Sequence, residues 1–370
     1  MQSYDSPTLL WDAQPATGRQ AGSMAERWSP DHLRLHRLLR RRPALLPQGS
    51  TLLLAVSGGQ DSMALLGLLA DLRRLHHWQL QLWHGDHGWR VESGRQAAEL
   101  AAWAEQRGLT LHSERWSEPQ ASEAAAREWR YGCLSRLAGA LAASRVVTGH
   151  TASDRAETLL LQLARGSHRR GLGSPRALRP LQERPEPGCV PVNRLQLARP
   201  LLQFSRADTA RLCSALELPI WPDPSNTDPA YGRNRIRQEV LPVLEALHPG
   251  ASRRLCGLSE RLAEEEESLA ELADLALQAL AASADARIEP GLASSLERRP
   301  LMALAPANRR RLLRRWLEWS GGPGLAAESL ELLLQRLAAG QPPGRQSLAG
   351  NLELQWNRER IWLAGHGPLP

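Results

Sequence analysis

The sequence predicts an α/β protein built on a doubly wound parallel sheet, followed by a helical linker and a small C-terminal α or α+β unit. Two observations support this fold class. Strand-like and helix-like segments alternate from Leu52 to about Arg165, which is typical of repeated β-α units. Polar or glycine-containing segments follow the first and last of the predicted strands, and ligands bind at that edge of such sheets. The expected site therefore lies at the carboxyl edge.

Hydrophobic periodicity places the individual elements. The apolar or alternating segments predict strands at residues 52–56, 78–83, 110–116 and 145–150. Met63, Leu66 and Leu69 share one helical stripe, and Ser122 is a typical N-cap. The helices that connect the strands are expected at residues 63–72, 92–109, 122–143 and 151–165.

The second half of the chain has different sequence patterns. Residues 166–195 are rich in Gly, Pro and Arg, so a loop region is expected there. A capping box formed by Ser205 and Asp208 predicts a helix over residues 205–218. Near-heptad leucines predict a long amphipathic helix from about Ala251 to Ala282, and its acidic run, residues 264–267, is expected to be a solvated face.

Composition limits the function classes. The chain of 370 residues has a net charge of +7 and a pI of about 10.1, so a polyanionic partner is plausible beside an inert basic surface. All 46 of its Lys and Arg residues are arginine, and this excludes the Gly-Lys-Ser/Thr phosphate loop. The four cysteines form no C-x-x-C pair, which argues against a zinc site and an iron–sulfur cluster. Scattered cysteines, no apolar membrane span and no signal pattern favour a cytoplasmic protein.

The stretch between the first strand and the first helix of the sheet carries the strongest chemical signal. Ser57-Gly58-Gly59-Gln60-Asp61-Ser62 interrupts the apolar pattern at a strand-to-helix turn. Glycines allow the backbone to fold tightly there, and the first N–H groups of a helix attract anions, most naturally phosphate. The simpler alternative is a plain turn with a Ser or Asp helix cap.

This S-G-G-x-D-S pattern resembles the pyrophosphate loop of the ATP pyrophosphatases, the PP-loop enzymes with a Rossmann-like, adenine nucleotide alpha hydrolase-like fold. Further stretches resemble the tRNA(Ile)-lysidine synthetase family within that superfamily. They are HGDHGWR (84–90), EAAAREWRY (123–131), GHTASDRAETLLLQLARGS (149–167), RPLL (199–202) and DPSNTDPAYGRNRIRQEVLPVL (223–244). Five motifs in the family's order make the resemblance specific.

The resemblance implies an ATP-dependent ligation of L-lysine to carbon 2 of the wobble cytidine in a tRNA(Ile) with a CAU anticodon. ATP would be the co-substrate, and Mg²⁺ would bind together with it. ATP contacts are expected from Ser57, Gly58, Gly59, Gln60, Asp61, Ser62, Asp86 and His87. Metal binding by His84, Asp86 and His87 is the alternative that their composition leaves open.

The substrate lysine needs carboxylates that hold its ammonium group and accept its proton. Asp154 and Glu157 lie three residues apart on one predicted helix face, so they are the expected lysine site. A capping box with Thr151 is the structural alternative for Asp154. His150 is either a catalytic group or a hydrogen-bonded structural histidine. The expected catalytic residues are Asp61, Arg130, His150 and Asp154.

Arginines are the expected tRNA contacts, because guanidinium groups bind phosphate. Arg127 and Arg130 share a helix face, with ion pairs to Glu123 or Glu128 as the alternative. A basic helix at residues 308–319 would bury Leu312, Leu313 and Trp316 and present its arginines to solvent. The full expected set is Arg127, Arg130, Arg233, Arg235, Arg237, Arg310 and Arg314, with the run 40–42 as a further basic segment.

The predicted organisation has a loose tail at residues 1–28, with Met24 as an alternative start, a PP-loop catalytic domain at 29–245, and a long helix with a tRNA-binding domain at 246–370. Another PP-loop tRNA-modifying enzyme, such as a tRNA thiolase, is the nearest rival function. A catalytically inactive tRNA-binding protein is the rival from a different class. The sequence leaves a homodimer open, and it predicts no membrane partner.

Overall fold

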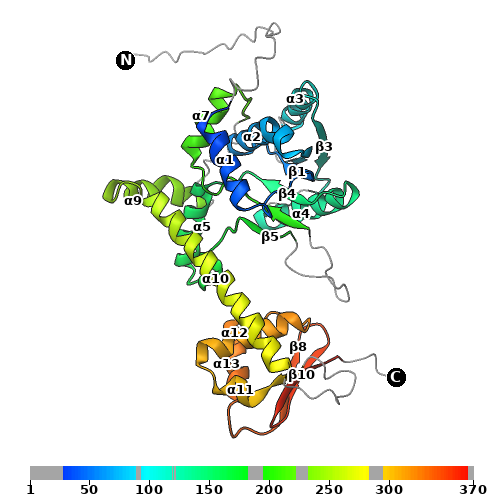
Figure 1. Ribbon diagram of the computed structural model, residues 1–370, viewed down its shortest axis with the longest axis vertical. Coiled ribbons are helices and arrows are strands. Elements are labelled where there is room, and N and C mark those ends of the chain that lie inside the picture. Colours follow the sequence, from blue (N-terminus) through cyan, green and yellow to red (C-terminus); the bar gives the residue numbers. More distant parts are fainter. Residues whose placement is uncertain are drawn as a thin grey trace, which may run out of the picture.

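The computed structural model describes residues 28–88, 93–118, 120, 122–181, 195–221, 232–282 and 295–365. The predicted tail at residues 1–28 lies almost wholly outside this part of the chain. Figure 1 shows an elongated molecule in which a unit built on one sheet is joined by the long helix α10 (Ala251–Ala282) to a smaller unit with a second sheet.

The first sheet has the strand order β3-β2-β1-β4-β6-β5. All neighbouring pairs are parallel except β5 with β6, which is antiparallel. The predicted α/β class with a largely parallel sheet is therefore confirmed. The strands are β1 (Thr51–Ala55), β2 (Gln79–Asp86), β3 (Thr110–Arg115), β4 (Arg145–Thr148), β5 (Leu178–Pro180) and β6 (Gln196–Ala198).

Helices cover both faces of this sheet, because alternate residues of the buried strands point to opposite sides. On β1, Leu52 and Leu54 join one apolar core with α1, α2, α3 and α7, whereas Leu53 joins another core with α4. The helices are α1 (Pro30–Arg41), α2 (Gln60–His76), α3 (Ser93–Glu105), α4 (Glu123–Ala140) and α7 (Arg206–Ala215). This double winding leaves the carboxyl ends of the strands free to carry a site.

A second set of helices connects the sheet to α10. Helix α5 (Ala152–Ala164) follows β4 and packs against α10. A short helix, a π-helical turn and another helix precede α10, namely α8 (Gly232–Arg235), Ile236–Val240 and α9 (Leu241–Leu247). The long helix α10 has the predicted bounds, because its apolar repeat is continuous over its whole length.

The prediction of a loop at residues 166–195 is wrong in part. The structure forms the helix α6 (Arg169–Leu172) and the strand β5 within it. Strand β5 forms because it pairs with β6. The Gly- and Pro-rich sequence around β5 gives no local signal of this long-range contact. Residues 182–194 of the expected loop lie outside the described part.

The smaller unit is α+β, one of the two predicted alternatives. Its antiparallel sheet has the order β7-β10-β9-β8. Its elements are β7 (Leu296–Glu297), α11 (Arg298–Ala303), α12 (Pro306–Trp319), α13 (Ala327–Arg336), β8 (Gly344–Leu348), β9 (Leu352–Trp356) and β10 (Arg360–Gly365). Leu312, Leu313 and Trp316 of α12 are buried in its core, as the spacing predicts.

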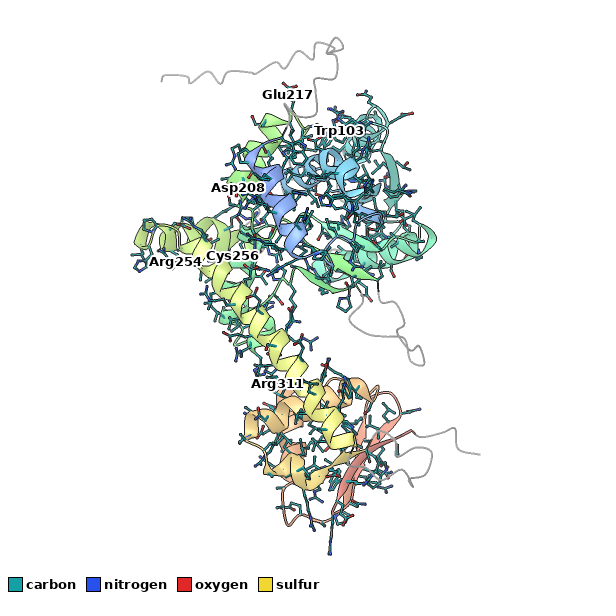
Figure 2. All side chains as sticks on the ribbon, in the orientation of Figure 1. Trp103, Asp208, Glu217, Arg254, Cys256 and Arg311 are labelled. Atoms are coloured by element: carbon teal, nitrogen blue, oxygen red, sulfur yellow. The ribbon has the colours of Figure 1, made fainter. Side chains whose placement is uncertain are left out.

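The acidic run of α10 is more than the solvated face that the sequence predicts. Each of its four glutamates meets an arginine of another segment: Glu264 pairs with Arg42, Glu265 with Arg169, Glu266 with Arg311 and Glu267 with Arg176. Three of these arginines belong to the first unit, whereas Arg311 belongs to α12 of the second. Figure 2 labels Arg311 where α10 reaches the smaller unit. The run therefore contacts both units from one stretch of helix.

Gly173 provides a test of the packing between α6 and α10. A Cβ atom at this position would lie 2.9 Å from the Ala263 backbone N and Cα atoms on α10. We expect Gly173→Ala to lower the free energy of unfolding by about 1–3 kcal/mol, because backbone atoms must shift to admit the methyl group. Gly139→Ala on α4, where nothing lies within 4 Å, is the control and should raise stability by about 0.5–1 kcal/mol. Urea unfolding measures both, and equal midpoints in the two variants would contradict the expectation.

Candidate functional site

The anion-binding loop lies between β1 and α2, as predicted. Gly58 has a φ of 80°, a left-handed conformation that glycine adopts without strain, and Gly59 is the N-cap of α2. The Gly59 N–H donates to Ser57 Oγ at 3.3 Å, and Ser57 Oγ lies 3.2 Å from Ser62 Oγ. The two predicted serine hydroxyls therefore meet at the helix N-terminus, where phosphate oxygens are bound well.

Asp61 is held at this helix start by α7. Thr209 Oγ1 donates to Asp61 Oδ1 at 2.5 Å, and Arg206 Nε lies 3.8 Å from Asp61 Oδ2. Burial raises the pKa of Asp61 and outweighs these contacts, which act to lower it. The Gln60 side chain points to α7 as well, because its amide donates to the Arg206 carbonyl and to Thr209 Oγ1. If Gln60 contacts ATP, it therefore does so through its backbone N–H.

Gly149 joins the anion-binding loop to the end of β4. A Cβ atom at Gly149 would lie 2.8 Å from the Asp61 carbonyl oxygen and 3.0 Å from Ser62 Cα. The absence of a side chain lets two backbone segments touch. The residues that follow β4 are thereby brought next to the loop, and Asp61 and Asp154 are close enough to raise the pKa of Asp61 electrostatically.

His150 follows Gly149 and is a neutral imidazole at physiological pH. Its Nδ1 lies 2.9 Å from Thr148 Oγ1. Burial lowers the pKa of His150 to about 3, and the charges of Arg199, Arg233 and Arg130 act in the same direction against that of Asp154. A catalytic His150 would therefore accept a proton or a hydrogen bond and would not act as a cation.

Asp154 has the capping role that the sequence offered as its structural alternative. It forms the capping box of α5, since the Thr151 N–H and Thr151 Oγ1 both donate to Asp154 Oδ2, at 2.8 and 3.0 Å. Both contacts use Oδ2, and no other described residue donates to Oδ1. Hydrogen bonds from Thr151 and the charges of His150 and Arg233 lower the pKa of Asp154 against the effect of burial. The carboxylate is charged, and one oxygen remains for a ligand.

Glu157, one turn further along α5, is completely buried and paired with an arginine. Arg237 donates from Nε to Oε1 at 2.6 Å and from Nη2 to Oε2 at 2.9 Å, while Arg233 Nε lies 3.7 Å from Oε2. Arg237 lies in the π-helical turn 236–240, and such turns are frequent at functional sites. Burial raises the pKa of Glu157, and neighbouring Asp154 adds to this effect.

The end of β2 contributes the predicted pair Asp86 and His87. Asp86 is 5% exposed; it accepts a hydrogen bond from the Gly88 N–H at 2.8 Å and another from Ser93, and these contacts hold its pKa below the usual value despite burial. His87 lies with its ring edge against Trp129, whose ring stacks on Trp116 at 5.4 Å and an angle of 12°. The described residues include no group of three His, Cys, Asp or Glu side chains placed to hold a metal ion.

The predicted tRNA arginines separate into three groups. Arg233 and Arg237 point inward against Glu157, which sequence spacing did not indicate. Arg235 pairs with Glu239 at the surface, and Arg310 of α12 pairs with Glu331 of α13. The remaining members are the exposed Arg127 and half-buried Arg130 on α4 and the half-buried Arg314 on α12.

Sequence reasoning missed two features of the site. One is the contact of Arg206 and Thr209 with Asp61, which joins segments 148 residues apart for Thr209. The other is a group of arginines around Tyr131, in which Arg127 and Arg179 lie over the ring at 4.8 and 5.3 Å. The one sequence signal for this group of arginines was Arg199, which lies in the RPLL stretch and for which no role was predicted.

Comparison with known proteins places the chain in a family. A family model described as a PP-loop domain matches residues 31–244, and one described as the TilS substrate binding domain matches residues 296–362. A tRNA(Ile)-lysidine synthase from Parasynechococcus marenigrum is 52% identical over 93% of this chain and 98% of its own. The chain belongs to the tRNA(Ile)-lysidine synthase family. Family members from Prochlorococcus marinus and Gloeobacter violaceus are 41% and 42% identical over 91% and 90% of this chain and 96% and 97% of their own.

A solved structure extends the likeness beyond the tRNA(Ile)-lysidine synthase family at the level of the fold. The U34-tRNA thiolase NcsA from Methanococcus maripaludis superimposes with a TM-score of 0.51 at 16% identity, over 63% of this chain and 80% of its own. At this identity the likeness shows the fold alone. Within the described residues, no helix combines the length and apolarity that crossing a membrane requires.

The lowered pKa of His150 gives a test of its burial in this family member. The folded pKa of about 3 lies below the ordinary 6.5, so the unfolded chain binds the proton first as the pH falls. The contribution of His150 to stability is complete above pH 6.5 and is lost toward pH 3. We expect His150→Asn to flatten the fall in unfolding free energy between pH 6.5 and 4.5 by up to about 1.4 kcal/mol per pH unit. Urea unfolding at several pH values measures the slope, and parallel curves for the two proteins would contradict the expectation.

Proposed function

We propose that the protein ligates L-lysine to carbon 2 of the wobble cytidine of tRNA(Ile) with a CAU anticodon, converting ATP to AMP and pyrophosphate. The product, lysidine, changes codon reading from AUG to AUA. Membership of the tRNA(Ile)-lysidine synthase family supports this reaction. The observation that carries it is the meeting of an anion-binding loop with a pair of carboxylates at one sheet edge, through the Gly149 contact.

In the first step, the cytidine oxygen attacks the α-phosphorus of ATP and pyrophosphate leaves. The N–H groups of residues 57–62 and the hydroxyls of Ser57 and Ser62 bind the phosphate oxygens at the start of α2. Asp61, in the same turn of chain as these serines, is the carboxylate that would hold Mg²⁺, and Mg²⁺ commonly binds one or two carboxylates together with phosphates. The ion, when bound, neutralises phosphate charge. Asp86 and His87 at the end of β2 are the proposed further contacts of ATP.

In the second step, the ε-amine of lysine attacks carbon 2 and AMP leaves. Asp154 Oδ1 faces the ammonium group, because Oδ2 is engaged in the helix cap. Glu157 is suited to accept the proton, since its pKa is raised and each of its oxygens keeps a lone pair beyond the Arg237 bonds. The neutral His150 feels the charges of both Asp154 and Arg130, and His150 and Arg130 are the further residues proposed at the reacting centre.

The tRNA contacts are proposed on the arginines that are not enclosed in the lysine site. Arg130 of α4 acts electrostatically on His150, and the exposed Arg127 lies three residues before it on the same helix, whereas Arg235 stands at the surface. Arg310 and Arg314 of α12 extend the basic surface into the region that matches the TilS substrate binding domain. A cytoplasmic location is proposed because the proposed substrate is a tRNA.

The thiolase alternative is not favoured. The relatives that match nearly the whole chain are tRNA(Ile)-lysidine synthases, whereas the thiolase shares the fold at 16% identity. Of the described cysteines, Cys133, Cys213 and Cys256 are buried and reduced. They stand on three different helices, α4, α7 and α10, which is unlike a paired sulfur-transfer site.

Incubation with labelled L-lysine, Mg²⁺-ATP and unmodified tRNA(Ile) tests the proposal directly. We expect the label in the wobble nucleotide after digestion and base analysis, with one AMP and one pyrophosphate released for each lysine incorporated. Omission of tRNA should abolish AMP release. Incorporation of sulfur in place of lysine, or no AMP release from the complete mixture, would overturn the proposed function.

Asp154→Asn tests the lysine site. The amide keeps an oxygen that accepts the Thr151 hydrogen bonds but loses the charge that attracts the ammonium group. We expect the KM for lysine to rise about 10- to 100-fold, the size of a lost charge-assisted hydrogen bond, while ATP binding persists. Asp154→Ala should in addition cost about 1 kcal/mol of stability through the lost cap.

The matched control for Asp154→Asn is Asp208→Asn. Asp208 occupies the same position of a second capping box, on α7, where the Ser205 N–H donates to its Oδ2. Steady-state kinetics with varied lysine separate the two variants. If Asp154→Asn and Asp208→Asn have the same KM for lysine, Asp154 does not bind the substrate.

A further inference from the structure

Arg155 is a buried cation to which the proposed reaction assigns no role. It is 2% exposed, and it stands on α5 directly after Asp154 and two residues before Glu157. Successive residues of an α-helix are turned by about 100°, so Arg155 points roughly opposite to Glu157. The acids of the proposed lysine site and this guanidinium group therefore occupy different faces of one helix.

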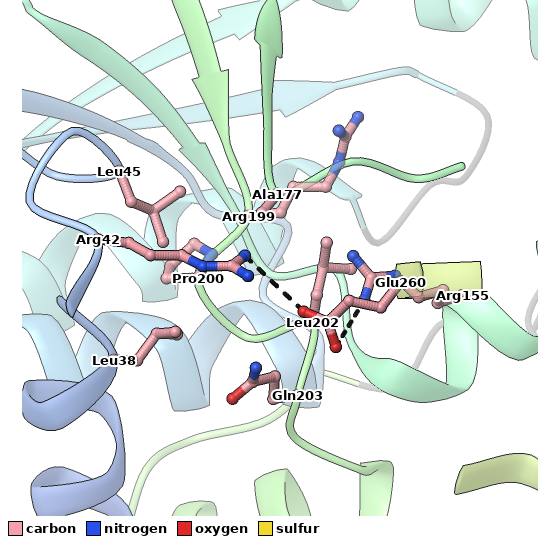
Figure 3. Close-up of a pocket in the computed structure, with 10 residues that line it drawn as sticks. All are labelled: Leu38, Arg42, Leu45, Arg155, Ala177, Arg199, Pro200, Leu202, Gln203 and Glu260. Carbon is pink, nitrogen blue, oxygen red and sulfur yellow. Dashed lines mark ion pairs between the residues drawn. The ribbon is translucent and has the colours of Figure 1, made fainter. Parts of the chain in front are cut away.

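The contacts of Arg155 join α5 to the helix that leads into the smaller unit. Its Nε and Nη2 atoms donate to the Pro175 carbonyl at 3.3 and 3.2 Å, and its Nη1 atom lies 3.7 Å from Glu260 Oε2 on α10. Glu260 Oε1 lies in turn 3.8 Å from Nη1 of Arg42, at the end of α1. Figure 3 shows Glu260 between these two guanidinium groups. One buried side chain thus connects α5 with α10 and with the segment between α6 and β5.

These contacts give α5 a direction more than they add stability. Both ion pairs of Glu260 are longer than a hydrogen bond, and Arg155 Nη1 has no hydrogen-bond partner among the described residues. Such a pair recovers little more than the cost of removing its charges from water, so apolar side chains of similar volume can replace it without loss of stability. Apolar side chains, however, have no directional contacts. The Pro175 carbonyl and Glu260 hold the guanidinium in one place, which favours one rotation of α5 about its axis.

The opposite face of α5 is fixed in a similar way. Arg237 binds both oxygens of Glu157, at 2.6 and 2.9 Å, from the π-helical turn. A rotation of α5 by about 10° would move a carboxylate that lies about 6 Å from the helix axis by about 1 Å. A misplacement of about 1 Å can lower a rate by about 100-fold. The rotation of α5 therefore matters for a substrate amine that Asp154 and Glu157 bind.

We propose that Arg155, through its pair with Glu260, is a positioning residue that sets the rotation of α5 and directs the carboxylates of that helix toward the lysine amine. The inference rests on the proposed function, in which Asp154 and Glu157 bind this amine. Arg155 itself touches no substrate, because its guanidinium group is directed to α10. Loss of the pair should weaken the use of lysine and leave the anion-binding loop unchanged, since that loop is held by α7 and Gly149.

Removal of the pair, one partner at a time and together, provides the test. Arg155→Met removes the charge and keeps an unbranched side chain, and it should raise the KM for lysine by about 10- to 100-fold while the KM for ATP changes by less than about 3-fold. Arg155→Lys keeps a charge opposite Glu260, so its KM for lysine should stay within about 5-fold of the wild-type value.

The double variant, Arg155→Met with Glu260→Met, separates positioning from stability. Because it leaves no buried charge unpaired, its thermal midpoint should lie within about 4 °C of that of the wild-type protein. Its KM for lysine should nevertheless stay as high as that of Arg155→Met. A merely structural role of Arg155 would return the KM for lysine to the wild-type value together with the stability.

Arg145→Met is the matched control. Arg145 also donates to backbone carbonyls, those of Ala44 and Ser144, but it stands at the amino end of β4, away from the site. Its loss should leave the KM for lysine within about 2-fold of the wild-type value, because surface-lying substitutions away from the site change little.

The outcomes separate the positioning role from the proposed function. If the stable double variant has the wild-type KM for lysine, Arg155 does not position α5. If its KM values for lysine, ATP and tRNA rise together, Arg155 only supports the core and the inference is overturned. If the Met variants do not fold, as judged by thermal melting, Glu260→Gln at the partly exposed partner decides by the same comparison of KM values. A wild-type protein that incorporates no lysine would refute the proposed function itself.

Discussion

The site depends on one close backbone contact, between Gly149 at the end of β4 and the first turn of α2. The position that a Cβ atom would occupy lies 2.8 Å from the Asp61 carbonyl oxygen, so only glycine admits this approach without a shift of backbone. Everything that follows β4 is placed by it. His150 and Asp154 come next in the chain, and they therefore stand beside the loop whose N–H groups are the proposed phosphate contacts.

Burial and neighbouring groups set the charges of the residues around this contact. Burial and three arginines keep His150 neutral, with a pKa of about 3, so the imidazole adds no positive charge near Asp154. Asp154 stays charged because Thr151 and its neighbours stabilise the carboxylate, while burial raises the pKa of Glu157. Arg233 and Arg237 lie against Glu157, so guanidinium groups stand directly beside the acids.

Local patterns predicted what local interactions determine. The strand-to-helix turn at residues 57–62, the capping boxes of Thr151 and Ser205, and the bounds of α10 all follow from residues within a few positions of each other. The sequence did not reveal contacts between distant segments. Arg237 was expected on the tRNA surface, yet it binds Glu157 across 80 residues of sequence, and the acidic run of α10 binds arginines up to 222 residues away. Charge in a sequence identifies a candidate partner class, but only the fold decides which opposite charge lies nearest.

The exclusive use of arginine also bears on the chemistry. A guanidinium group stays protonated under all conditions in which the protein is folded, so Arg237 can neutralise Glu157 but cannot exchange a proton with it. Its planar fork binds both carboxylate oxygens and still leaves lone pairs for a third partner. Because the chain contains no lysine, no side-chain ammonium group of its own competes for the two carboxylates. The proposed role of Asp154 and Glu157 in binding a substrate amine is therefore compatible with the charges that the chain itself supplies.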